Sequence, residues 1–140
     1  MKLGLFGGSF DPVHEGHVLM AHAALEELSL DRLCFIPAAQ SPLKPDAPPA
    51  SGPVRTAMLR TALAGEPRFS IDDQELVRGG ISYTIDTVRA FLAASPGVEL
   101  FYMIGADHVP VLPKWREADQ LAKLVEFIVV PRPGEEPQPF

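Results

Sequence analysis

Two histidines near the start of the chain, His14 and His17, have the residue type and the spacing to bind phosphate groups. They lie in the segment GGSFDPVHEGH, and imidazole nitrogens can donate hydrogen bonds to phosphate oxygens. Gly16 stands between them and leaves room for a phosphate to approach. Gly7 and Gly8 allow a tight turn and a close approach of the backbone, and a helix beginning near Gly16 would direct free amide groups at an anion. The segment therefore predicts phosphate recognition.

The segment differs from two known phosphate motifs, and its histidines allow one alternative to phosphate binding. The segment matches neither the phosphate loop that ends in Gly, Lys and Ser or Thr, nor the dinucleotide pattern GxGxxG. The two histidines could also be zinc ligands of a metal-dependent hydrolase, which predicts tight stoichiometric zinc. No cysteine or third ligand stands at zinc-like spacing, and HEGH lacks the i, i+4 histidine pair of a zincin helix.

The elements that position these residues follow from the apolar pattern of the chain. Short apolar runs predict strands at residues 2–6, 33–36, 100–104 and 125–130, and a short strand within residues 69–76. Helices are expected at residues 16–28, after the N-cap Ser51, at 84–94 and around 115–122. Each of the three longer helices has a candidate buried face, namely Val18, Ala21, Leu25 and Leu28; Val54, Met58 and Ala62; and Ile85, Val88 and Leu92.

Strands and helices alternate, and the strands are continuous apolar runs, which is typical of a parallel sheet covered on both faces. We therefore expect a Rossmann-like α/β fold in one domain, residues 1–130, followed by a Pro-rich tail, residues 131–140. Ligands of such sheets bind outside the carboxyl ends of the strands. The segments after the strands bring a polar set toward one crevice: Ser9, His14, His17, Lys44, Asp107, His108 and Arg132.

Composition narrows the classes of partner. The 140 residues carry a net charge of −6 and no cluster of basic residues, which argues against binding to nucleic acid or to a membrane surface. No segment approaches the roughly 20 apolar residues that span a bilayer. The single cysteine, Cys34, fits a reduced compartment and is expected to be a small buried hydrophobe, so the expected location is cytoplasmic. His22 is expected to be a packed or surface histidine.

Several motifs, taken together, carry a family resemblance. They are GGSFDPVHEGH, SYTIDTVR at residues 82–89, GAD at 105–107, PKW ending at Trp115, and RPG at 132–134. In order and approximate spacing the chain resembles the bacterial nicotinate-nucleotide adenylyltransferases, members of the HxGH nucleotidyltransferase superfamily. The histidine pair alone is shared across that superfamily, whereas the other motifs are more specific.

The resemblance implies transfer of AMP from ATP to nicotinate mononucleotide, a step of NAD biosynthesis, with Mg²⁺ held mainly by the ATP phosphates. It implies catalytic roles for His14, His17 and Lys44. The implied ATP-binding residues are Gly7, Gly8, Ser9, Phe10, His14, His17, Gly105 and Asp107. The implied residues for nicotinate mononucleotide are Lys44, Thr84, Trp115 and Arg132. An indole can also stack on a pyridinium ring with a cation-π contribution, although Trp115 could instead be a core anchor, and Asp107 could cap the next helix.

One family feature has no counterpart in these 140 residues. The family carries a second phosphate motif of the ISSTxIR type, and the resemblance therefore implies a fold that lacks the last strand-helix segment. We expect weak or absent turnover on this ground. Alternatives are a related adenylyltransferase for nicotinamide mononucleotide or pantetheine phosphate, or a non-catalytic nucleotide-binding remnant, with a homodimer as a further possibility. Pantetheine phosphate is disfavoured by Gly7, where that relative usually has proline.

Overall fold

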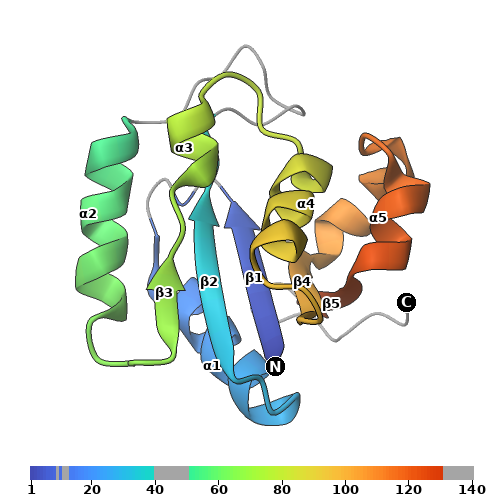
Figure 1. Ribbon diagram of the computed structural model, residues 1–140. Coiled ribbons are helices and arrows are strands. Elements are labelled where there is room, and N and C mark those ends of the chain that lie inside the picture. Colours follow the sequence, from blue (N-terminus) through green and yellow to red (C-terminus); the bar gives the residue numbers. More distant parts are fainter. Residues whose placement is uncertain (9, 11–12, 40–50, 131–140) are drawn as a thin grey trace.

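Five parallel strands form one sheet in the order β3-β2-β1-β4-β5 (Figure 1). The computed structural model describes residues 1–8, 10, 13–39 and 51–130 of the chain, with the side chain of Asp107 left out. The strands are β1 (Lys2–Gly8), β2 (Arg32–Pro37), β3 (Phe69–Ile71), β4 (Glu99–Gly105) and β5 (Glu126–Val130). Every neighbouring pair is parallel, so the expected Rossmann-like parallel sheet is confirmed. The expected tail, residues 131–140, lies outside the described residues.

Helices cover both faces of this sheet. They are α1 (Glu15–Glu27), α2 (Gly52–Leu63), α3 (Gln74–Arg78), α4 (Thr84–Ala94), the 3-10 helix η1 (Ala106–Lys114) and α5 (Ala118–Leu124). Helices α1 and α2 pack on one face, and α4 and α5 pack on the other (Figure 1). Neighbouring strand residues point to opposite faces, so Phe35 and Ile36 are both fully buried in different cores. Two-sided burial explains why the strands are apolar throughout.

The predicted buried face of α2 is wrong. Val54 and Met58 are 53% and 40% exposed, whereas the helix buries Arg55, Thr56, Leu59 and Leu63. Arg55 donates a hydrogen bond from Nη1 to the carbonyl oxygen of Ala38 at 2.7 Å, just after β2. A buried guanidinium thus anchors α2 to the end of a strand, and an apolar pattern cannot reveal an anchor of this kind.

Other helices follow the sequence more closely. The predicted range of α4 is confirmed, as is the predicted N-cap Ser51 of α2, which accepts a hydrogen bond from the backbone of Val54 at 3.4 Å. The short strand predicted within residues 69–76 is confirmed as β3, which ends at Ile71 and is followed by α3. The predicted helix at 115–122 begins only at Ala118, after a 3-10 helix that contains two prolines. Trp115 is extended and Glu117, the N-cap of α5, has a φ of 51° in the left-handed region, so neither residue continues an α-helix.

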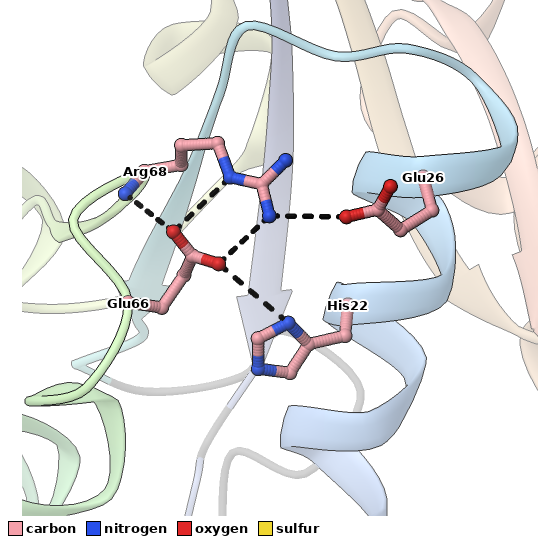
Figure 2. A network of polar contacts seen from close by, with 4 residues as sticks. All are labelled: His22, Glu26, Glu66 and Arg68. Atoms are coloured by element: carbon pink, nitrogen blue, oxygen red, sulfur yellow. Dashed lines mark hydrogen bonds and ion pairs between the residues drawn. The ribbon is translucent and has the colours of Figure 1, made fainter.

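A charged network joins α1 to the segment between α2 and β3, at the amino end of the sheet (Figure 2). Glu66 accepts hydrogen bonds from the side chain of Arg68, from Nε at 3.1 Å and from Nη2 at 2.8 Å. Nη2 of Arg68 also donates to Glu26 of α1 at 3.1 Å. His22 of α1 lies 3.8 Å from Glu66, so this histidine belongs to the surface network, in keeping with the prediction. Because Arg68 favours the charged carboxylate, it lowers the pKa of Glu66 to about 2.

This network predicts an acid-sensitive contribution to stability. A carboxyl with a lowered pKa stabilises the fold above its unfolded value, 4.5, and that stabilisation is lost as the pH falls from 4.5 toward 2. We expect Glu66→Gln to lower the melting temperature at pH 7 and to bring it close to that of the parent at pH 2.5. Thermal melts across this range measure both values. Glu27→Gln, an exposed change on α1, is the control, and an equal offset at both pH values for Glu66→Gln would contradict the prediction.

Candidate active site

The carboxyl ends of the strands meet at one edge of the sheet and bring the start of α1 beside them. The backbone N–H of Ala38, after β2, donates to the carbonyl oxygen of Gly8 at the end of β1, at 2.9 Å. His14 is the N-cap of α1 and His17 lies in its first turn. The sequence therefore placed the histidine pair correctly at the start of a helix that follows β1.

The two imidazoles are stacked, and their backbone hydrogen bonds fix how each ring is used. The ring centroids are 3.7 Å apart, with an angle of 25° between the planes. Nδ1 of His14 accepts a hydrogen bond from the backbone N–H of Gly16 at 3.1 Å, and Nδ1 of His17 accepts one from the backbone N–H of His14 at 3.0 Å. An imidazole whose Nδ1 is an acceptor carries its proton on Nε2. Each ring therefore offers an Nε2–H donor.

His17 is a neutral donor at neutral pH. Half-burial of the ring, with a smaller contribution from the neighbouring His14, lowers the pKa of His17 to about 4. Its ring lies edge-on to two aromatic rings, with centroid distances of 5.2 Å to Phe10 and 5.9 Å to Phe6. A pocket of this kind holds the ring in one orientation. His17 can therefore donate a hydrogen bond to an anion without carrying charge of its own, beside the Nε2–H donor of His14.

Phe10 packs against the ring of His17. Its side chain is only 3% exposed and contacts Phe6 and Phe35 with ring centroids 5.4 Å and 5.5 Å away. Its φ of 47° lies in the left-handed region, which is unfavourable for a bulky residue and is held here by the aromatic packing. Phe10 was predicted as an ATP-binding residue. The buried side chain leaves only its backbone for such a contact.

The position of Gly7 in β1 has no room for a side chain, because a Cβ there would meet Tyr102. A Cβ built on Gly7 would overlap the hydroxyl of Tyr102, which comes from the neighbouring strand β4. Tyr102 is buried, and burial raises the pKa of its phenol. The phenol shares a hydrogen bond with the side chain of Thr84, the first residue of α4. Tyr102 thus joins the end of β1 to the start of α4.

Trp115 follows η1 and is half-buried among aromatic rings. Its ring centroid lies 6.2 Å from that of Tyr102 and 6.4 Å from those of Phe127 and His108, and the rings of all three neighbours are close to perpendicular to it. The next residue, Arg116, places its guanidinium 3.6 Å from the ring centroid of Tyr83, the N-cap of α4. The structure thus brings Trp115 and Thr84 to the same region through Tyr102.

Four predicted residues fall wholly or partly outside the described structure. Ser9, Lys44 and Arg132 are not described, nor is the side chain of Asp107, whose backbone lies in η1. The prolines of residues 37–52 predict a loop that orders when ligand binds, and this loop includes the undescribed stretch 40–50. The predicted N-cap role of Asp107 does not hold, because the N-cap of η1 is Gly105.

Tyr102, Glu75 and Arg55 were missed in the sequence, although each holds part of this edge of the sheet. A glycine within a strand indicates close approach of another group, so Gly7 was a signal for Tyr102. No comparable signal marks Glu75 or Arg55. Cys34 was expected to be a buried hydrophobe and is only partly buried, with Sγ 2.9 Å from the hydroxyl of Ser70.

The donor groups of this edge suit phosphate better than a metal ion. Within residues 1–8, 10, 13–39 and 51–130, no three side chains of His, Cys, Asp or Glu gather as a metal site. Both Nδ1 atoms of the histidine pair already accept backbone hydrogen bonds. This donor set does not fit the zinc hydrolase alternative.

No helix among the described residues is long and apolar enough to cross a bilayer.

Comparison with known proteins decides the family. The profile of the cytidylyltransferase-like family matches residues 5–139. A protein of Opitutus terrae named "Probable nicotinate-nucleotide adenylyltransferase" is 51% identical over 134 residues, which are 96% of this chain and 69% of that protein. The chain belongs to the nicotinate-nucleotide adenylyltransferase family. The resemblance found in its motifs is thus confirmed over nearly the whole chain.

A second relative matches a similar share of the chain, and a solved structure has the same fold. A protein of the same name in Shouchella clausii is 47% identical over 133 residues, covering 95% of this chain and 69% of that protein. A solved structure, "Plasmodium falciparum nicotinic acid mononucleotide adenylyltransferase complexed with NaAD", shares the fold with a TM-score of 0.77 at 14% identity. It is matched over 96% of this chain and 77% of its own. The chain is therefore shorter than these nucleotidyltransferases.

Proposed function

We propose that the chain transfers the AMP group of ATP to the 5′-phosphate of nicotinate mononucleotide, with release of pyrophosphate. The observation that carries the proposal is the stacked pair His14 and His17, whose backbone hydrogen bonds leave one Nε2–H donor on each ring at the start of α1. Family membership and the names of the relatives support the same substrates.

In this reaction the protein positions the two substrates and stabilises the charge that develops on the phosphate oxygens. An oxygen of the acceptor phosphate attacks the α-phosphorus of ATP, the bond between that phosphorus and the bridging oxygen breaks, and pyrophosphate leaves with the electron pair. A phosphate monoester has a second pKa near 6 and is largely ionised at neutral pH, so no general base is required. Donors aimed at the oxygens of the α-phosphate and of the leaving group stabilise the charge that develops there.

The neutral state of His17 suits this role. With a pKa of about 4, His17 donates from Nε2 without a prior protonation step. A bound polyphosphate favours the charged form of a nearby imidazole and raises its pKa. A second proton on the ring would have to go to Nδ1, which accepts the backbone N–H of His14 at 3.0 Å, so this hydrogen bond opposes protonation and keeps Nε2–H as a neutral donor to the phosphate.

The remaining assignments extend this site. ATP is bound by Gly7, Gly8 and the residues that follow them through Phe10, and by Gly105 and Asp107. Thr84 and Trp115 flank the nicotinate ring, and Lys44 and Arg132 contact phosphates of the substrates. The described part of the chain offers no carboxylate cluster for a divalent cation, so Mg²⁺ enters with ATP on the phosphates, whose charge it partly neutralises.

A pyrophosphate-release assay tests the proposal. The chain is incubated with ATP and Mg²⁺ in parallel with nicotinate mononucleotide, nicotinamide mononucleotide or phosphopantetheine, and thermal shifts are recorded with each ligand. We expect release with nicotinate mononucleotide, at a low rate, and a melting temperature raised by that ligand and by ATP. Release with only one of the other two acceptors would replace the acceptor assignment. A thermal shift without release would favour the non-catalytic nucleotide-binding alternative over the enzyme.

A further inference from the structure

Glu75 is a buried carboxyl that the proposed reaction does not use. It lies in α3 with 5% of its surface exposed, and its Oε2 accepts a hydrogen bond from the hydroxyl of Thr87 at 2.5 Å. The side chain of Ser82 hydrogen-bonds to the same carboxyl. Thr87 and Ser82 are also buried, at 0% and 7% exposed. Burying a carboxyl is costly unless its oxygens accept hydrogen bonds. The hydroxyls of Thr87 and Ser82 supply such hydrogen bonds, so the burial of Glu75 depends on these two residues.

The Glu75 carboxyl accepts hydrogen bonds from residues on both sides of one short turn. Ser82 and Thr87 stand two residues before and three residues after Thr84, the first residue of α4. From the opposite direction, the hydroxyl of Tyr102 shares a hydrogen bond with Thr84 itself. The position of Thr84 is therefore fixed by a side chain of α3 and by a side chain of β4.

The same hydroxyl network reaches the ends of β2 and β1. The Oγ of Ser82 accepts a hydrogen bond from the backbone N–H of Ala39, after β2, at 3.2 Å. Ala38, the residue before it, donates to the carbonyl oxygen of Gly8 at the end of β1. Glu75 thus connects α3 and α4 through Ser82 to the ends of β2 and β1, from which the chain leads to the histidine pair.

We propose that Glu75 is a positioning residue for the acceptor subsite, because it fixes the turn that presents Thr84 opposite Trp115. This inference rests on the proposed function. Glu75 touches neither substrate. Its loss lets the turn shift, and a shift of this kind weakens the binding of the acceptor ring while the phosphate donors of His14 and His17 stay in place.

The only tryptophan of the chain makes the acceptor subsite directly measurable. Trp115 fluorescence is titrated with nicotinate mononucleotide, and ATP binding is measured separately by calorimetry. We expect Glu75→Gln to weaken nicotinate mononucleotide binding by about tenfold and ATP binding by less than about threefold. Where turnover is measurable, KM for the acceptor rises and kcat changes little, because Glu75 contacts no reacting atom.

Matched variants separate positioning from a general loss of structure. Ser82→Ala removes a hydroxyl of the network, and Ser70→Ala removes one that contacts Cys34 on the strands. Only the first is expected to weaken acceptor binding. If Glu75→Gln leaves both affinities unchanged, or lowers both together with the melting temperature, the inference is overturned. If the parent chain itself shows no response to nicotinate mononucleotide, the proposed function fails instead.

Discussion

Replacing His17 with asparagine is expected to lower the rate of AMP transfer by about 100- to 1,000-fold, the range measured when one preorganised donor to a developing oxyanion is removed. Asparagine can keep an acceptor near the position of Nδ1, which caps the backbone N–H of His14 at 3.0 Å. It places no donor where Nε2 lies. The rate of pyrophosphate release with ATP and nicotinate mononucleotide measures the effect.

His17→Gln is the informative partner of this variant, since its amide nitrogen reaches toward the position of Nε2. We expect it to retain more activity than His17→Asn. His22→Ala is the matched control, because this histidine lies on the same helix and contacts Glu66 rather than the histidine pair. An His17→Asn protein that releases pyrophosphate at the parent rate would remove His17 from the mechanism.

Gly7→Ala is expected to destabilise the fold by about 1–3 kcal/mol, the usual cost of overpacking a core. The added methyl overlaps the hydroxyl of Tyr102, and that side chain is buried between the sheet and α4. Displacement of Tyr102 also breaks its hydrogen bond with Thr84, so acceptor binding is expected to weaken in the same variant. Urea unfolding measures the stability, and Trp115 fluorescence measures the binding.

A second substitution tests the cause of this loss. In a Tyr102→Phe background the hydroxyl is gone, and the nearest ring atom to the new methyl is Cζ at 3.1 Å, a contact that a small shift can relieve. Gly7→Ala is therefore expected to cost less in that background than in the parent. Gly65→Ala is the control, since a Cβ there meets nothing within 4 Å. Equal costs of Gly7→Ala in both backgrounds would show that Tyr102 is not the obstacle.

Much of the fold could be predicted from local sequence because burial of apolar side chains has a simple pattern. Continuous apolar runs such as residues 100–104 predicted parallel strands, and the spacing of Ile85 and Val88 predicted the buried face of α4. The histidine pair was found in the same way, because the spacing of His14 and His17 at a helix start already specifies neighbouring donors. Each of these inferences depends on residues close together in the chain.

Contacts between buried polar groups were decided only by the tertiary structure. The face of α2 was mispredicted because Arg55, a charged residue, is buried against the carbonyl oxygen of Ala38. Glu75 and Thr87 are likewise buried as partners, 12 residues apart and on different helices. A polar side chain is buried only when its partner is in place, and a partner from another element cannot be read from hydropathy or spacing.

The residues alone predict the family, the parallel sheet and two histidines placed together at the start of a helix. The tertiary structure decided which ring nitrogens of His14 and His17 are available, because the backbone N–H groups of His14 and Gly16 occupy both Nδ1 atoms. The tertiary structure also explains why residue 7 is a glycine. The hydroxyl of Tyr102 fills the space that a side chain would need, and Tyr102 belongs to a strand more than 90 residues later in the chain. Motifs specify residue types, whereas tautomers and close contacts depend on the folded geometry around them.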